Sequence, residues 1–119
     1  MRDGKIVAAV TGMDHGHING MTEGIGEAGA VIKWAYDPDT EKTKTFLNHF
    51  QKFQVKEAKN LEQILEDPEV DLVLSACIPS QRADLGIRVM EAGKDYFVDK
   101  APFTTLEQLE QIRKAIDKT

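Results

Sequence analysis

The sequence predicts an α/β fold in which a doubly wound parallel sheet of five or six strands carries helices on both faces. Two observations and one general rule predict it. Short β-branched runs alternate with stretches of helical periodicity along the 119 residues. None of the links between these segments resembles a two-residue hairpin. Strands that alternate with helices are joined by right-handed crossovers, which produce a parallel sheet covered on both faces.

The expected strands are short apolar runs, most of them bounded by turn residues. The most strand-like is VDLVLSACI, residues 70–78, and the first, KIVAAVT, ends at Gly12, which suits a tight turn. The five strands are expected at residues 5–11, 30–36, 53–58, 70–78 and 95–100.

The expected helices show apolar residues at three- and four-residue spacing, together with residues that begin or end a helix. Thr40 and Asn60 are expected to cap two of them, and Thr104 with Glu107 has the pattern of a capping box. Gly29 and Gly93 are expected to end helices. The helices are expected from His17 to Ala28, from Thr40 to Phe50, and over residues 61–65, 81–92 and 104–116.

Composition limits the classes of function. Apolar residues make up 41% and charged residues 29%, as in a globular domain, and the net charge is −5. Without a basic cluster, neither nucleic acid nor a membrane is an expected partner. Cys77 is the only cysteine, so no internal disulfide and no cysteine-based zinc site can form. The start of the chain does not resemble a signal peptide, and a cytoplasmic location is expected.

The loop VTGMDHGHING, residues 10–20, lies where an open parallel sheet binds ligands. Gly12 suits the tight turn, and the start of the next helix would present N–H groups to an anion. The fingerprint G-x-G-x-x-G is not satisfied, because Asp14 and His17 replace its later glycines and Gly16 comes one place early. Asp14 would repel a diphosphate unless it turns away or a neighbouring histidine neutralises it. We interpret the loop as a degenerate phosphate cradle.

Asp37 ends the second expected strand, 25 residues after Gly12. In dinucleotide-binding folds an acidic residue near this position accepts the ribose hydroxyls, and its charge favours NAD over NADP. The sequence DPD could equally be a turn in which Asp37 caps the following helix. Both interpretations stay open.

Asp14, His15 and His17 also offer three potential metal ligands on one short loop. No second cluster supports a metal, and His49 lies in a different expected helix. Histidines in such a loop are more often solvated or hydrogen-bonded to a ligand. No metal is therefore assigned.

The second half of the chain carries a family resemblance. LEQILEDPEVDLVLSACIPSQRADLGIRVMEAGKDYFVDKAPFTTLEQLEQI resembles the N-terminal half of the Gfo/Idh/MocA oxidoreductases. The family shows a strand ending near a proline, a helix closed by Ala-Gly-Lys and, after the next strand, Glu-Lys-Pro. This chain has Pro79, then Ala92-Gly93-Lys94, then Asp99-Lys100-Ala101-Pro102. The resemblance covers essentially the whole chain and implies one Rossmann-like dinucleotide-binding domain, residues 1–119.

The resemblance implies an NAD(P)-dependent oxidoreductase that transfers hydride to or from the nicotinamide and acts on a sugar, inositol or related polyol. Asp37 would bind the adenosine ribose. Lys100 would be the catalytic residue, contacting substrate and cofactor and polarising the reacting hydroxyl. The implied cofactor-binding residues are Gly12, Met13, Asp14, His15, Gly16 and His17 at the diphosphate, Asp37, and Ala76, Cys77, Ile78, Pro79, Asp99 and Lys100 toward the nicotinamide.

Four residues depart from the family pattern and indicate a divergent branch. Asp14 replaces a glycine, Asp99 a glutamate, and Ala101 separates Lys100 from the proline. Ala83 stands where many members have a histidine. Lys94 is interpreted as an exposed charge beside a structural glycine.

The family's second domain, which carries much of the substrate site, is not found in these 119 residues. The chain is therefore expected to be inactive alone and to belong to a longer enzyme, which would be a homo-oligomer that binds its small-molecule substrate through the missing domain. Two alternatives stay open. One is a stand-alone nucleotide-binding or regulatory module that has lost catalysis, and the other is an interaction domain with a vestigial ligand crevice.

Overall fold

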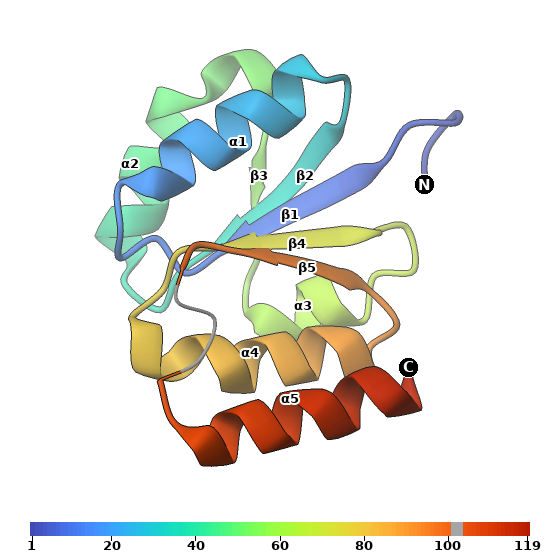
Figure 1. Cartoon of the computed structure of the whole chain (residues 1–119). Coiled ribbons are helices and arrows are strands. Elements are labelled where there is room, and N and C mark those ends of the chain that lie inside the picture. Colours follow the sequence, from blue (N-terminus) through green and yellow to red (C-terminus); the bar gives the residue numbers. More distant parts are fainter. Residues whose placement is uncertain (101–103) are drawn as a thin grey trace.

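The computed structural model describes residues 1–100 and 104–119 and confirms the predicted α/β class (Figure 1). A single five-stranded parallel sheet runs in the order β3-β2-β1-β4-β5. The strands are β1 (Val7–Thr11), β2 (Val31–Tyr36), β3 (Lys56–Glu57), β4 (Leu72–Ser75) and β5 (Asp95–Val98).

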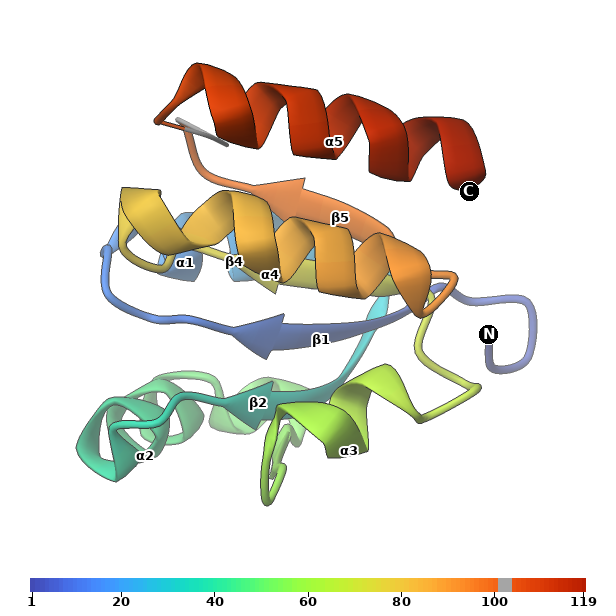
Figure 2. The same cartoon turned by 90° about the horizontal axis from the view of Figure 1, so that it is seen from below.

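The helices cover both faces of the sheet. α1 and α2 lie on one face, and α3 and α4 lie on the other, with α5 packed outside α4 (Figures 1 and 2). None of the helices in the described part of the chain is long and apolar enough to span a bilayer. Their bounds are α1 (His17–Glu27), α2 (Thr40–His49), α3 (Leu61–Leu65), α4 (Pro79–Glu91) and α5 (Leu106–Lys118), with a 3₁₀ turn η1 (Gln51–Phe53) after α2.

The central strand explains why the core has two halves. Every residue of β1 is buried, and successive side chains of a strand point to opposite faces. Ala8 and Val10 pack among apolar residues of α1 and α2. Val7 and Ala9 pack among those of α3 and α4. The uncharged run that predicted this strand therefore reflects burial on both faces.

The strand order reverses between β1 and β4. From β1 the chain continues outward through β2 to β3. It then returns through α3, on the face opposite α1 and α2, to β4 and continues to β5 (Figure 2). Helices that follow neighbouring strands therefore leave in opposite directions at this point, and a crevice opens at the carboxyl ends of β1 and β4.

Several expected boundaries are wrong by a few residues. The cap of α2 is Asp39, which accepts the N–H of Glu41, and not Thr40. The cap of α5 is Thr105, which accepts the N–H of Gln108, and not Thr104. Both errors have one cause, since neighbouring Asp and Thr residues are chemically equivalent candidates and backbone geometry decides between them.

The expected strands at residues 53–58, 70–78 and 95–100 are shorter than predicted. Gln51–Phe53 forms a 3₁₀ turn, which leaves only Lys56–Glu57 to pair with β2. β4 ends at Ser75 because the chain then bends into α4, which starts at Pro79 rather than residue 81. Pro79 is favoured there because the first turn of a helix needs no N–H donor.

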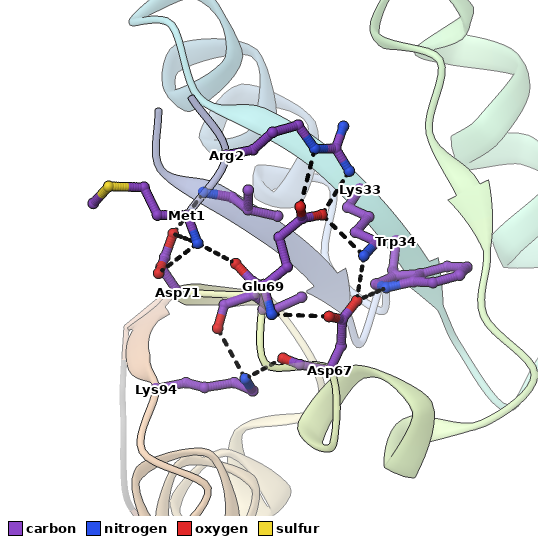
Figure 3. A network of polar contacts seen from close by, with 10 residues as sticks. Met1, Arg2, Lys33, Trp34, Asp67, Glu69, Asp71 and Lys94 are labelled. Atoms are coloured by element: carbon purple, nitrogen blue, oxygen red, sulfur yellow. Dashed lines mark hydrogen bonds and ion pairs between the residues drawn. The ribbon is translucent and has the colours of Figure 1, made fainter. Parts of the chain in front are cut away.

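A polar network closes the edge where β1, β2, β4 and β5 begin, here called the amino edge (Figure 3). The ammonium group of Lys33 lies 2.6 Å from Asp67 and 3.0 Å from Glu69. Trp34 donates its indole N–H to Asp67 at 2.8 Å, and Arg2 pairs with Glu69 at 2.6 Å. Each carboxylate in this network thus has more than one donor.

Lys94 belongs to the same network, which corrects its interpretation as an exposed charge. Only 7% of the residue is exposed. Its ammonium group donates to the carbonyl oxygens of Asp67, at 2.7 Å, and Val70, at 2.8 Å. Burial lowers the pKa of this lysine. The Ala-Gly-Lys step therefore ties the end of α4 to the loop before β4.

Candidate functional site

A cleft of about 420 Å³ opens at the opposite edge, where β1, β2, β4 and β5 end, here called the carboxyl edge. It lies beside the reversal of strand order, as ligand sites of open α/β sheets do. Three loops meet in it: those after β1, β2 and β4. Its lining includes Gly12 and Asp14, Asp37 and Asp39, Lys42, and Cys77 and Ile78.

Gly12 allows the first loop to lie against the end of β4. Its φ is +81°, and an added Cβ would lie 2.7 Å from both Cys77 Cβ and Ser75 Oγ. Hydrogen bonds continue the sheet past β1: Ala76 donates its N–H to Gly12, at 2.9 Å, and His15 donates to Ala76, at 3.0 Å. Glycine is required here by both conformation and space.

The charge of Asp14 is neutralised by a lysine rather than by a neighbouring histidine. Its Oδ1 lies 2.5 Å from the ammonium group of Lys42 on α2, and its Oδ2 accepts the N–H of Ile78 at 3.0 Å. This contact raises the pKa of Lys42. The aspartate thereby joins the loops after β1 and β4 across the cleft.

Asp37 is buried at the end of β2, where its two carboxylate oxygens hold two loops. Oδ2 accepts the N–H of Met13 at 2.8 Å, and Oδ1 accepts the N–H of Asp39 at 2.8 Å. Its own N–H is donated to the Thr43 hydroxyl at 3.0 Å. Asp37 therefore makes the local turn contact that the sequence allowed, although Asp39 is the helix cap, and it also lines the cleft.

A second group of predicted residues meets at the end of β5. His17 Nδ1 lies 3.0 Å from Asp99 Oδ2, and His15 Nδ1 lies 3.7 Å from the same oxygen. Burial raises the pKa of Asp99, but the hydrogen bond and charge of His17, with a smaller contribution from Arg82, outweigh it and the net pKa is lowered. The structure thus brings together residues 82 positions apart in sequence.

His15, His17 and Asp99 place three possible ligand atoms within 4.8 Å of one another, and Asp14 takes no part. Their surroundings oppose a divalent cation. The guanidinium of Arg82 lies 3.9 Å from Asp99, and the positive end of the α1 dipole lies at His17. His15 Nδ1 also accepts the N–H of His17 at 3.1 Å. Positive charge therefore already lies beside the carboxylate of this cluster.

Lys100 lies just after β5 and is exposed, beside Asp99. Its backbone carbonyl accepts a hydrogen bond from Arg82, a residue of α4 that the sequence analysis missed. A signal was available, because Arg82 shares a helical stripe with the buried Gly86 and Val89. Ala101, which departs from the family motif, and Pro102, which completes it, lie outside the described residues.

Four more predicted residues lie between the end of β4 and the start of α4. Ala76 and Cys77 are buried, and burial raises the pKa of the thiol, which opposes thiolate chemistry. Ile78 is 48% exposed and Pro79 is the first residue of α4. Gly16 directly precedes α1, in the loop after β1 that also contains Asp14 and His15. All described members of the predicted site therefore lie on the carboxyl edge.

Residues 9–119 match a family model described as an oxidoreductase family with an NAD-binding Rossmann fold, the Gfo/Idh/MocA family. A search of curated proteins finds no match.

Solved structures share the fold. An oxidoreductase described from Erwinia carotovora atroseptica SCRI1043 is 36% identical, with a TM-score of 0.91 over 97% of this chain and 34% of that one. The WlbA dehydrogenase of Bordetella pertussis, solved with NADH and UDP-GlcNAcA, is 19% identical, with a TM-score of 0.84 over 99% of this chain and 35% of that one. The myo-inositol 2-dehydrogenase of Lactobacillus plantarum is 17% identical, with a TM-score of 0.77 over 96% of this chain and 33% of that one. The chain thus spans about a third of the length of these proteins.

Proposed function

Since the chain belongs to the Gfo/Idh/MocA oxidoreductase family, we propose that it is the NAD-binding domain of a dehydrogenase that acts on a sugar, inositol or related polyol. One observation carries the proposal: Asp37 and the Gly12 loop line one cleft at the reversal of strand order. The adenosine would bind in this cleft and the diphosphate at the start of α1. A substrate domain, a homo-oligomer and a cytoplasmic location for the longer protein remain predictions.

The ribose contact is compatible with the bonds that Asp37 already makes. Each of its oxygens accepts one backbone N–H, and an ionised carboxylate offers about four acceptor sites in total. Two sites therefore remain for ribose hydroxyls. The existing bonds would hold the carboxylate in position before the nucleotide arrives.

The charges of the cleft favour NAD over NADP. Asp37, Asp39 and Asp84 line it, and they would repel an added phosphate. The two cations that line it are already paired: Lys42 with Asp14, at 2.5 Å, and Arg88 with Glu62, at 2.7 Å. A 2′-phosphate would need an uncommitted cation, as NADP-binding members of this fold provide.

The chemistry would take place toward the end of β5. The bound nicotinamide supplies the hydride acceptor or donor. Lys100 would lie beside the reacting hydroxyl and stabilise negative charge on its oxygen, or accept its proton. The backbone N–H groups at the start of α1, with ring N–H groups of His15 and His17, would donate hydrogen bonds to the diphosphate.

Calorimetric titration of the chain with NADH and with NADPH tests the proposal. We expect saturable binding of NADH and weaker binding of NADPH. Asp37→Asn keeps the side-chain shape but removes its charge, so NADH affinity should fall about tenfold and the preference over NADPH should shrink. Asp117→Asn, an exposed position on α5, is the matched control and should change neither. A folded chain that binds neither nucleotide would overturn the proposal and favour an interaction domain.

A further inference from the structure

Arg82 is the largest fully buried side chain among the described residues, with 2% of its surface exposed. It lies in α4, whose other buried residues are small or apolar: Ala83, Gly86 and Val89. A guanidinium in such a place costs free energy unless its N–H groups are hydrogen-bonded. We therefore expect the hydrogen bonds of Arg82 to have a role in addition to packing.

Those contacts connect the ends of two strands. The Nε of Arg82 donates to the carbonyl of Cys77, after β4, at 2.8 Å. Its Nη1 donates to the carbonyls of Asp99, at 3.1 Å, and Lys100, after β5. Only arginine carries several donors in one planar fork, so no other side chain can hold three carbonyls in this way.

The same stretch of α4 is also attached to β5 by a second side chain. Tyr96 donates its hydroxyl to the carbonyl of Arg82 at 3.0 Å, and its ring would lie 2.6 Å from a Cβ at Gly86. The sheet itself holds β5 only as far as Asp99, whose N–H bonds to Ser75 at 3.1 Å, the last sheet bond along this strand within residues 1–100 and 104–119. From there on, Arg82 takes over the positioning of the backbone.

We propose that Arg82 is a positioning residue for the nicotinamide half of the site. By fixing the backbone of Asp99 and Lys100 relative to Cys77, it sets the point from which the Lys100 side chain reaches cofactor and substrate. This inference rests on the proposed function, because Lys100 acts only if a nicotinamide nucleotide binds. Loss of about 1 Å in placement is enough to weaken a preorganised contact severely.

The two halves of NADH separate positioning from general structural support. ADP would occupy only the adenosine cleft at the ends of β1 and β2, whereas NADH would also reach the end of β5. We expect Arg82→Lys, which keeps the charge but loses the fork, to weaken NADH binding about tenfold and to change ADP binding by less than about twofold. Arg82→Met should show the same split more strongly. Arg113→Met, an exposed arginine of α5, is the control for both.

A double-mutant cycle with Lys100→Met tests whether Arg82 acts through that lysine. Arg82→Lys should weaken NADH binding in the natural chain but by less than about twofold once Lys100 is methionine. If the two effects multiply, or if NADH and ADP weaken equally, the inference is overturned.

If Arg82→Met does not fold, the Arg82→Lys measurements decide alone, since melting temperature establishes folding separately. Failure of the proposed function gives a different result, namely that the natural chain binds no NADH. A natural chain that binds NADH, with an unchanged NADH-to-ADP affinity ratio in Arg82→Lys, overturns only the inference.

Discussion

The two edges of the sheet use charged residues for opposite purposes. At the amino edge, Asp67 and Glu69 are surrounded by Lys33, Arg2 and backbone donors (Figure 3). At the carboxyl edge, carboxylates bind loop N–H groups and single cations around a cleft of about 420 Å³. The first arrangement leaves little for a ligand to bind, and the second preserves an opening with its walls held in place.

Chain direction explains the difference. In a parallel sheet all strands end at one edge, where the following helices begin and point their N–H groups inward. That edge can therefore attract anions. The amino edge receives helix ends and their carbonyls, and here Lys94 satisfies two loop carbonyls at the same edge. We therefore expect amino-edge substitutions to change stability alone and carboxyl-edge substitutions to change binding.

The largest expected effect is that of Asp67→Asn at the amino edge. Its side chain is 13% exposed and is bonded to Lys33 and Trp34. Removing its charge weakens the hydrogen bonds from Lys33 and Trp34 and leaves Glu69 as the remaining carboxylate beside Lys33, so the free energy of unfolding should fall by about 3 kcal/mol. Chemical denaturation measures this value, and NADH affinity, measured on the folded protein, should stay unchanged.

Asp117→Asn on α5 serves as the control for lost charge and should leave stability nearly unchanged. A large change in NADH affinity for Asp67→Asn would show that the two edges are coupled. The division between a stability edge and a binding edge would then be wrong.

The next effect is the response of the amino edge to acid. The pKa of Asp67 is about 2, because hydrogen bonds from Lys33 and Trp34 outweigh burial, and Arg2 and Lys33 bring the pKa of Glu69 to about 2. Both pKa values lie below those of the unfolded chain, so their stabilisation is complete above about pH 4.5 and is lost as pH falls toward 2. Protonation of Asp67 accounts for about 2 kcal/mol of the free energy of unfolding that is lost on acidification.

Melting temperatures recorded between pH 6 and pH 2 check this prediction. The double variant Asp67→Asn with Glu69→Gln should be less stable at neutral pH but should lose less stability on acidification than the natural chain. Equal slopes for the two proteins would place the acid sensitivity elsewhere.

Much of the fold could be predicted because burial on both faces leaves a direct record in sequence. The uncharged strands β1 and β4 and the periodicity of the helices are examples. The cap at Thr105 and the short β3 could not be predicted, since adjacent residues of similar chemistry compete and packing decides. Lys94 shows the same limit: its sequence neighbours do not reveal the two carbonyls that bury it.

The geometry of the candidate site was predictable where one loop contains its own polar residues and not where distant segments meet. Gly12 and Asp37 follow recognisable strands, and both line the cleft. The contact of His17 with Asp99 and the contact of Asp14 with Lys42 join residues far apart in sequence. Spacing within the loop suggested Asp14 as a partner of the histidines, whereas the fold supplies Asp99.

The smallest expected effect comes from Lys42→Met at the carboxyl edge. Lys42 is the cation that neutralises Asp14 in the loop after β1, and both side chains are partly exposed. The melting temperature should hardly change, because exposed ion pairs contribute little stability. NADH affinity should fall about fivefold, since Asp14 would then repel the diphosphate, and the loss should shrink as salt rises.

Two further variants separate this charge effect from others. Lys44→Met removes an exposed lysine of the same helix and should not affect NADH binding. Adding Asp14→Asn to Lys42→Met removes the uncompensated charge while keeping an acceptor for the Ile78 N–H, so affinity should recover. If it does not recover, Lys42 supports binding by direct contact with the nucleotide rather than by neutralising Asp14. The carboxyl edge would then use its cations as ligands as well as supports.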